Sequence, residues 1–129
     1  MNVLNFEDSV YKANAIRKVL NQCGVVKIEL VLNVEDGLQM LKNAEDTGDP
    51  FDLIITDMHY PMKQGAVSDT EAGEKLVQLL QEQGKQTKVI VCSSRNMKLP
   101  GMYGCIWYSE ISDWEEELCD LVREMEKNR

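Results

Sequence analysis

Short apolar runs alternate with amphipathic segments along the whole chain of 129 residues, and this alternation restricts the fold more than any other feature. Strands that alternate with helices form a parallel sheet covered by helices on both faces. We therefore expect one α/β domain over residues 1–129, a three-layer αβα sandwich around a five-stranded parallel sheet. The runs that suit the five strands of its sheet lie at residues 3–6, 28–32, 53–56, 88–92 and 105–108.

Capping residues predict where the helices begin. Ser9 and Asn33 each precede an amphipathic segment and predict the starts of the first two helices. Two capping boxes, Ser68–Glu71 and Ser112–Glu115, predict the starts of the third helix and of the last helix. The segment Arg95–Tyr103 has weak helical periodicity, so a short helix and a loop both stay open there.

Charge and composition exclude several classes of function. A net charge of -8 argues against direct binding to nucleic acid or to an anionic membrane. No apolar run approaches the roughly 20 residues that span a bilayer, and the N-terminus has no signal segment. The four cysteines include no Cys-x-x-Cys pair, which argues against zinc. We interpret them as small buried hydrophobes in a reducing compartment and expect a cytoplasmic protein.

Acidic residues follow two of the predicted strands. Asp57 ends the most apolar stretch of the chain, and the pair Glu7 and Asp8 ends the first apolar run. Each feature alone could be a helix or turn cap. Their joint occurrence favours a site, because sites in open parallel sheets lie beyond the carboxyl ends of the strands. Carboxylates that gather there repel unless a cation intervenes, and oxygen ligands at a solvated edge suit Mg²⁺.

The same position gives Asp57 a second possible role. A carboxylate can attack a phosphoryl group and form an aspartyl-phosphate. Ser93 ends the fourth predicted strand, so its hydroxyl should face the same edge and could donate a hydrogen bond to a phosphoryl oxygen. These two residues are the candidate catalytic pair.

Taken together, these segments resemble the receiver domain of two-component response regulators over essentially the whole chain. The resemblance implies flavodoxin-like (βα)5 topology and a single receiver domain with no output domain. The resemblance implies that Asp57 is the phosphoacceptor. It implies Mg²⁺ bound by Asp8, Asp57 and the backbone carbonyl of Met58, with Glu7 acting directly or through water. The matching segments are residues 3–9 with the acidic pair, 36–38 at the second helix, 52–62 with the Asp-x-x-x-Pro loop, and 89–94 with the hydroxyl.

The resemblance also implies the roles of further residues and the kinds of partner. Ser93 would rotate toward the phosphoryl group and Tyr108 would report the change, while His59 and Arg95 would tune hydrolysis. The protein would be a phosphorelay switch and not a turnover enzyme. Its phosphoryl donor would be a sensor histidine kinase or a histidine phosphotransfer protein, and a downstream protein target would receive the signal. We expect a monomer or a weak dimer.

The chain departs from the receiver pattern in three places. The lysine that follows the fifth strand in the family is missing, and Glu110 or Ile111 stands near its place. Arg95 is the residue we predict as its substitute. The loop after Pro61 is about eight residues too long if Gly73 matches the family's glycine. The fourth helix is shortened, which affects the face that transmits the signal in the family.

Three alternative functions stay open. The missing lysine favours a pseudo-receiver, an interaction module that is not phosphorylated in use. A phosphatase with an aspartyl-phosphate intermediate would commonly need a second Asp two residues after the nucleophile, where this chain has His59. A flavin-binding protein of similar topology would need a hydroxyl- and glycine-rich loop after the first strand. Glu7 and Asp8 would instead repel a phosphate at that place.

Overall fold

The five predicted strands form one parallel sheet in the computed structural model, which describes residues 1–129. The strand order β2-β1-β3-β6-β7 confirms the predicted fold class. Because the chain moves outward from β1 to β2 and then returns to β3, the order reverses between β1 and β3, where ligands bind in such sheets. The strands are β1 (Asn2–Phe6), β2 (Lys27–Val31), β3 (Leu53–Thr56), β6 (Lys88–Ser93) and β7 (Gly104–Trp107).

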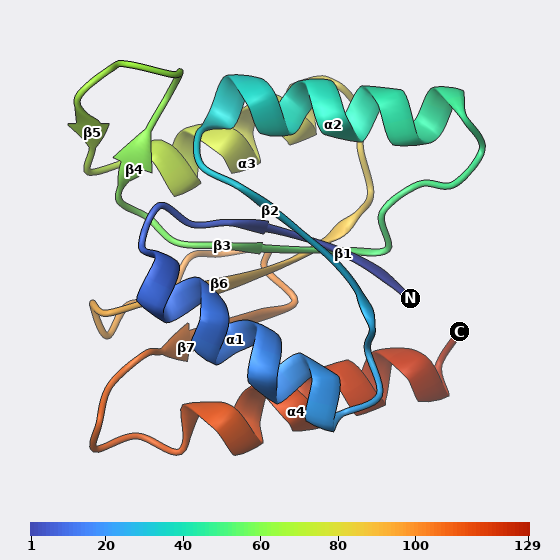
Figure 1. Cartoon of the computed structure of the whole chain (residues 1–129), viewed down its shortest axis with the longest axis vertical. Helices are drawn as coiled ribbons and strands as arrows, with labels where there is room; N and C mark the ends of the chain where they lie inside the picture. The colour runs from blue at the N-terminus through green and yellow to red at the C-terminus, as the bar shows by residue number, and fades with distance from the viewer.

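Two helices cover each face of the sheet (Figure 1). Helices α1 (Val10–Gln22) and α4 (Trp114–Lys127) lie on one face, and α2 (Val34–Asp46) and α3 (Ala72–Glu82) lie on the other. The buried residues divide into two clusters accordingly, since alternate residues of a strand point to opposite faces. In β3, Leu53 and Ile55 pack toward α1 and α4, whereas Ile54 packs toward α2 and α3.

The loop after Asp57 contains a small hairpin that the sequence analysis did not predict. Strands β4 (Tyr60–Pro61) and β5 (Ser68–Asp69) pair antiparallel outside the main sheet. Helix α3 begins only at Ala72, and its first turn receives no side-chain cap. The capping box predicted at Ser68–Glu71 is therefore wrong, because Asp69 accepts the Glu71 N–H (2.8 Å) and the Lys75 ammonium (2.6 Å) as part of the hairpin.

The predicted starts of the other helices had mixed outcomes. Ser9 accepts the Lys12 N–H (3.3 Å) and Asn33 accepts the Asp36 N–H (2.8 Å), so both of these caps are confirmed. The capping box at Ser112–Glu115 is wrong, because Asp113 makes no side-chain cap to α4. The Ser112 hydroxyl donates instead to the Trp107 carbonyl at 2.6 Å, which closes the loop between β7 and α4.

No helix forms between β6 and β7, so the Arg95–Tyr103 segment is a loop. Leu99 and Met102 of this loop pack against the cluster under α2 and α3. The Tyr103 N–H donates to the Val89 carbonyl at 2.8 Å and anchors the segment on the sheet. The sequence predicted that the helix in this place is shortened, and in the structure it is absent.

Two cysteines are bonded, contrary to the interpretation of all four as reduced hydrophobes. Cys23 at the end of α1 and Cys119 in α4 form a disulfide across 96 positions of sequence, with 5.8 Å between their Cα atoms. Cys92 is buried and Cys105 is half-buried, and both are free thiols. The pairing was not visible in the spacing, because it depends on the two helices lying side by side on one face of the sheet. None of the four helices combines the length and the hydrophobicity that a membrane-spanning helix requires.

Candidate functional site

The acidic edge predicted from the sequence forms where β1 and β3 end side by side. Phe6 is paired with Thr56 in the parallel register, so the next residues, Glu7 and Asp57, leave the sheet together. The Asp57 N–H donates to the Phe6 carbonyl at 3.1 Å, which extends the pairing by one step. Asp8 follows on the exposed side of the same edge. The site lies at the point where the strand order reverses.

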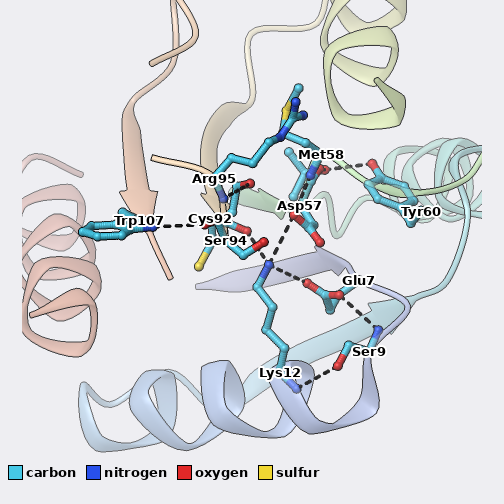
Figure 2. A network of polar contacts seen from close by, with 12 residues as sticks. Glu7, Ser9, Lys12, Asp57, Met58, Tyr60, Cys92, Ser94, Arg95 and Trp107 are labelled. Carbon is cyan, nitrogen blue, oxygen red and sulfur yellow. Dashed lines mark hydrogen bonds and ion pairs between the residues drawn. The ribbon is translucent and has the colours of Figure 1, made fainter. Parts of the chain in front are cut away.

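A buried lysine, which the sequence analysis missed, lies between two of these carboxylates. The side chain of Lys12 rises from the first turn of α1, and its Nζ is 2.9 Å from Glu7 Oε1 and 3.3 Å from Asp57 Oδ1 (Figure 2). The same ammonium donates to the Cys92 carbonyl at 2.6 Å. Lys12 is only 6% exposed and Glu7 only 1%. The arrangement is therefore a buried ion pair shared among β1, β3 and α1.

The signal for Lys12 was present in the helical periodicity. Lys12 lies four and seven positions before Ile16 and Val19, which are both buried on the inner face of α1. A lysine on the apolar face of a helix needs a buried partner, because a lone buried charge is costly. The carboxylates after β1 and β3 were the available partners. That combination of clues predicts the ion pair without any structure.

The remaining contacts hold each carboxylate in place. Glu7 Oε2 accepts the Ser9 N–H at 3.0 Å, whereas Oε1 has no directed hydrogen bond besides its ion pair with the ammonium. Asp57 Oδ1 accepts the Met58 N–H at 2.7 Å in addition to its contact with Lys12. Asp57 Oδ2 makes no hydrogen bond or ion pair to the protein, and the side chain is 15% exposed. One oxygen of Asp57 is thus fixed and the other is free.

The ionisation of these groups follows from burial and from their mutual attraction. Burial raises the pKa of the Glu7 carboxyl, and the charge of Asp57 adds to this effect, although Lys12 opposes it. Burial alone would lower the pKa of Lys12, but attraction to Asp57 and Glu7 outweighs it and raises that pKa. Lys12 is therefore a cation at neutral pH. Burial also raises the pKa of the Cys92 thiol to about 12, so this thiol is neutral.

The raised pKa of Glu7 predicts a specific pH dependence of stability. Between pH 4.5 and the raised pKa, the folded protein binds more protons at Glu7 than the unfolded chain does, so stability falls as pH rises. The stabilisation of wild type relative to Glu7→Gln, measured as the difference in their free energies of unfolding, should be largest below pH 4.5. This stabilisation should decline between pH 4.5 and the raised pKa of Glu7 and should be constant at higher pH. Urea unfolding at a series of pH values measures it, and a difference that rises with pH contradicts the assignment.

The oxygen ligands that the resemblance implied for Mg²⁺ do not fit a divalent ion as they are arranged. Glu7 and Asp57 face the ammonium of Lys12, which lies where an ion shared by the two carboxylates would have to be. The Met58 carbonyl accepts the Gly73 N–H at 3.2 Å and so is engaged with α3. Asp8 is exposed and makes no hydrogen bond or ion pair. The donor set therefore offers a divalent ion only Asp8 and Asp57 Oδ2, and the second of these belongs to a carboxylate already paired with Lys12.

Ser93 and Arg95 lie close to each other at the end of β6. The Ser93 hydroxyl is buried and accepts the Arg95 N–H at 3.1 Å. The Arg95 guanidinium donates to the Thr70 carbonyl at 3.1 Å, on the loop that leads to α3. It is therefore Lys12, and not Arg95, that contacts Asp57. The roles of Ser93 and Arg95 toward a phosphoryl group stay predictions.

Tyr108 lies beside the Lys12 cation, whereas His59 lies on the loop after Asp57. The Lys12 ammonium lies over the Tyr108 ring, 5.2 Å from its centroid, and the same ring packs on Trp114 at 4.9 Å. Tyr108 thus touches the cation that holds Asp57, and its role as a reporter stays a prediction. His59 is exposed on the loop after Asp57, next to the hairpin.

Gly73 allows α3 to begin against the backbone of Asp57. A Cβ at this position would overlap the Asp57 carbonyl oxygen and would lie 2.9 Å from Met58 Sδ. Only glycine permits this close approach. Gly65, by contrast, has open space around it. The contact supports the register in which Gly73, not Gly65, takes the place of the glycine in the receiver pattern.

The edge opens into a solvent-filled cleft of about 860 Å³. Glu7, Lys12 and Asp57 form its floor, and residues of α1 and of the loop between β7 and α4 form its walls. A cleft of this size at the end of a parallel sheet can admit a small anion or the side chain of a partner protein.

Comparisons with known proteins agree with the fold. No family model and no curated protein matches the sequence. The receiver domain of Francisella response regulator 1452 matches with a TM-score of 0.71 at 16% identity, over 99% of this chain and 98% of that chain. The N-terminal domain of a response regulator/sensory box/GGDEF 3-domain protein from Carboxydothermus hydrogenoformans matches with a TM-score of 0.69 at 20% identity, over 99% and 95%.

A third solved structure extends the same likeness. The chemotaxis protein CheY4 of Vibrio cholerae matches with a TM-score of 0.68 at 18% identity, over 96% of this chain and 97% of that chain. These likenesses cover nearly the whole of each molecule. The chain therefore has the fold of response-regulator receiver domains.

Proposed function

We propose that this chain is a receiver-type signalling module in which Asp57 accepts a phosphoryl group and Lys12 supplies the positive charge that the missing lysine would have provided. The observation that carries the proposal is the state of the Asp57 carboxylate. Its Oδ1 is held by the Lys12 ammonium and the Met58 N–H, while its Oδ2 is free at the cleft. A fixed carboxylate with one free oxygen is suited to nucleophilic attack.

The proposed reaction is a transfer from a phosphohistidine on a partner protein. Asp57 Oδ2 attacks phosphorus and a new O–P bond forms, while the N–P bond of the donor breaks. The electron pair leaves with the imidazole nitrogen, which takes a proton from solvent. Charge develops on the phosphoryl oxygens, and such transfer depends mainly on positioning and neutralisation. Lys12 would neutralise part of this charge, and Ser93 is the predicted hydroxyl donor.

The partners follow from this chemistry. The donor would be a sensor histidine kinase or a histidine phosphotransfer protein, and the output would be a contact with a downstream protein. The proposal includes no divalent ion, because the Lys12 ammonium already supplies a positive charge to both Glu7 and Asp57. His59, Arg95 and Tyr108 are proposed to modulate the lifetime or the readout of the phosphorylated form.

A small phosphodonor tests the proposal directly. Treatment with phosphoramidate should add one phosphoryl mass to the intact protein, and Asp57→Asn should abolish it. Asp46→Asn, which removes an exposed carboxylate at the end of α2, should leave the labelling unchanged. Labelling of wild type that survives in Asp57→Asn would contradict the assignment of the phosphoacceptor.

A second candidate function is an interaction module that is never phosphorylated in use. It is favoured by the loss of the helix between β6 and β7, since that face transmits the signal in the domains that this chain resembles. If neither phosphoramidate nor acetyl phosphate labels the folded wild-type protein, this second function replaces the first.

A further inference from the structure

The ammonium of Lys12 is surrounded by oxygen atoms as a bound metal ion would be. Glu7 Oε1, Asp57 Oδ1 and the Cys92 carbonyl oxygen lie 2.9, 3.3 and 2.6 Å from Nζ. These three atoms come from the ends of β1, β3 and β6, three neighbouring strands of the sheet. An ammonium has three protons and no lone pair, so one oxygen for each proton completes its surroundings.

Several contacts keep this cation in place. Lys12 lies on the inner face of α1, where its aliphatic stem is buried. The Tyr108 ring lies on another side of the ammonium, 5.2 Å away at its centroid, and a cation over an aromatic face is attracted by it. Displacing the ammonium would leave the buried Glu7 carboxylate without its counter-charge.

A divalent ion at this edge would compete for the same oxygen atoms. Mg²⁺ keeps several waters and binds through one or two carboxylates, so at this edge it would have to draw on Asp57 or Glu7, both of which are paired with Lys12. The ion would then lie close to a positive charge that is already held by three partners, and like charges at that range repel strongly. Asp8 is exposed to water, and the one free oxygen of Asp57, Oδ2, belongs to the carboxylate whose other oxygen is 3.3 Å from the ammonium.

We propose that Lys12 is a built-in counter-cation that excludes divalent metal ions from the site, so that Asp57 is phosphorylated without one. The exclusion of metal is a property of the folded chain and needs no phosphorylation. The second half, phosphorylation without a divalent ion, rests on the proposed function of Asp57. The chemistry of the transfer is unchanged, and the ammonium provides the charge neutralisation that the divalent ion would provide.

Titration with Mn²⁺ tests the exclusion of metal. Electron paramagnetic resonance reports the free Mn²⁺ in the presence of wild type, Lys12→Met and Lys18→Met. Lys18 is an exposed lysine on the same helix and serves as the matched control. Wild type and Lys18→Met should show no stoichiometric binding. Lys12→Met should bind one Mn²⁺ roughly tenfold or more tightly, because a buried positive charge is replaced by a neutral side chain of similar length.

Each outcome of the Mn²⁺ titration either supports or overturns the exclusion of metal by Lys12. One Mn²⁺ bound by wild type, with binding lost in Asp57→Asn, overturns the proposal. A folded Lys12→Met protein that gains no affinity overturns the role of the lysine, and circular dichroism establishes whether that variant is folded. If it does not fold, the wild-type titration alone decides whether metal is excluded.

Labelling with phosphoramidate in EDTA and in Mg²⁺ tests the second half. Equal rates support phosphorylation without a divalent ion, and labelling that requires Mg²⁺ overturns it. If no condition labels the wild-type protein, the proposed function of Asp57 fails and this second half fails with it. The exclusion of metal is then judged by the Mn²⁺ titration alone.

Discussion

Lys12→Met should lower the free energy of unfolding by about 3–5 kcal/mol at neutral pH, the range found when one partner of a buried ion pair is removed. Methionine keeps the length and the aliphatic contacts of the side chain, so the loss reflects the missing charge. Glu7 is the carboxylate most affected, because it is almost completely buried and Lys12 is its only ionic partner.

The loss of stability in Lys12→Met should depend on pH and on whether Glu7 keeps its carboxylate. It should shrink as pH falls through the raised pKa of Glu7, because a protonated carboxyl no longer needs a counter-charge. The double variant Glu7→Gln/Lys12→Met should recover a large part of the loss, since a neutral pair replaces a broken one. Urea unfolding of the single and double variants measures the coupling.

Lys18→Met is the control for this experiment. Lys18 is exposed on the same helix and should change stability by less than about 0.5 kcal/mol. If Lys12→Met were as mild as the control, the buried ion pair would have no energetic role, and the proposed neutralisation of Asp57 would lose its basis.

Gly73→Ala should be the second large effect, with a loss of about 3 kcal/mol in stability from overpacking against a rigid neighbour. The new methyl group would meet the carbonyl oxygen of Asp57, which is backbone and cannot rotate away. Helix α3 and the loop after β3 would have to separate, and the Gly73 N–H would lose the Met58 carbonyl. The Asp57 carboxylate would move with its backbone.

The variant should therefore lose function in addition to stability. Labelling by phosphoramidate should be slowed at temperatures where the variant is still folded. Gln78→Ala, on the exposed side of the same helix, is the matched control and should preserve both properties. A Gly73→Ala protein with wild-type stability would show that α3 can shift freely, and the close approach would not fix Asp57.

Much of the fold could be predicted because its physical determinants are local. Residues 53–56 are apolar without interruption, and they became a strand buried on both faces at the centre of the sheet. Ser9 and Asn33 cap their helices through bonds to residues three positions ahead. Asp57 and Glu7 could be placed together because parallel strands end at one edge.

What escaped prediction depends on distant partners. Ser68 and Asp69 have the sequence of a helix start, but pairing with Tyr60 and Pro61 drew them into a hairpin. The Cys23–Cys119 bond required two helices from opposite ends of the chain to lie together. Lys12 was overlooked because a lysine in an amphipathic helix is usually exposed to solvent, although its partners at positions 7 and 57 had already been identified.

The disulfide anchors the C-terminal end of α1 more firmly than its N-terminal end. Cys23 fastens the last turn of the helix to α4 covalently, while Lys12 in the first turn is held by noncovalent contacts alone. Any rearrangement of Lys12 around a modified Asp57 would make α1 swing about its C-terminal anchor rather than slide along the sheet. The greatest displacement would then occur at the rim of the cleft, where Tyr11 is 82% exposed.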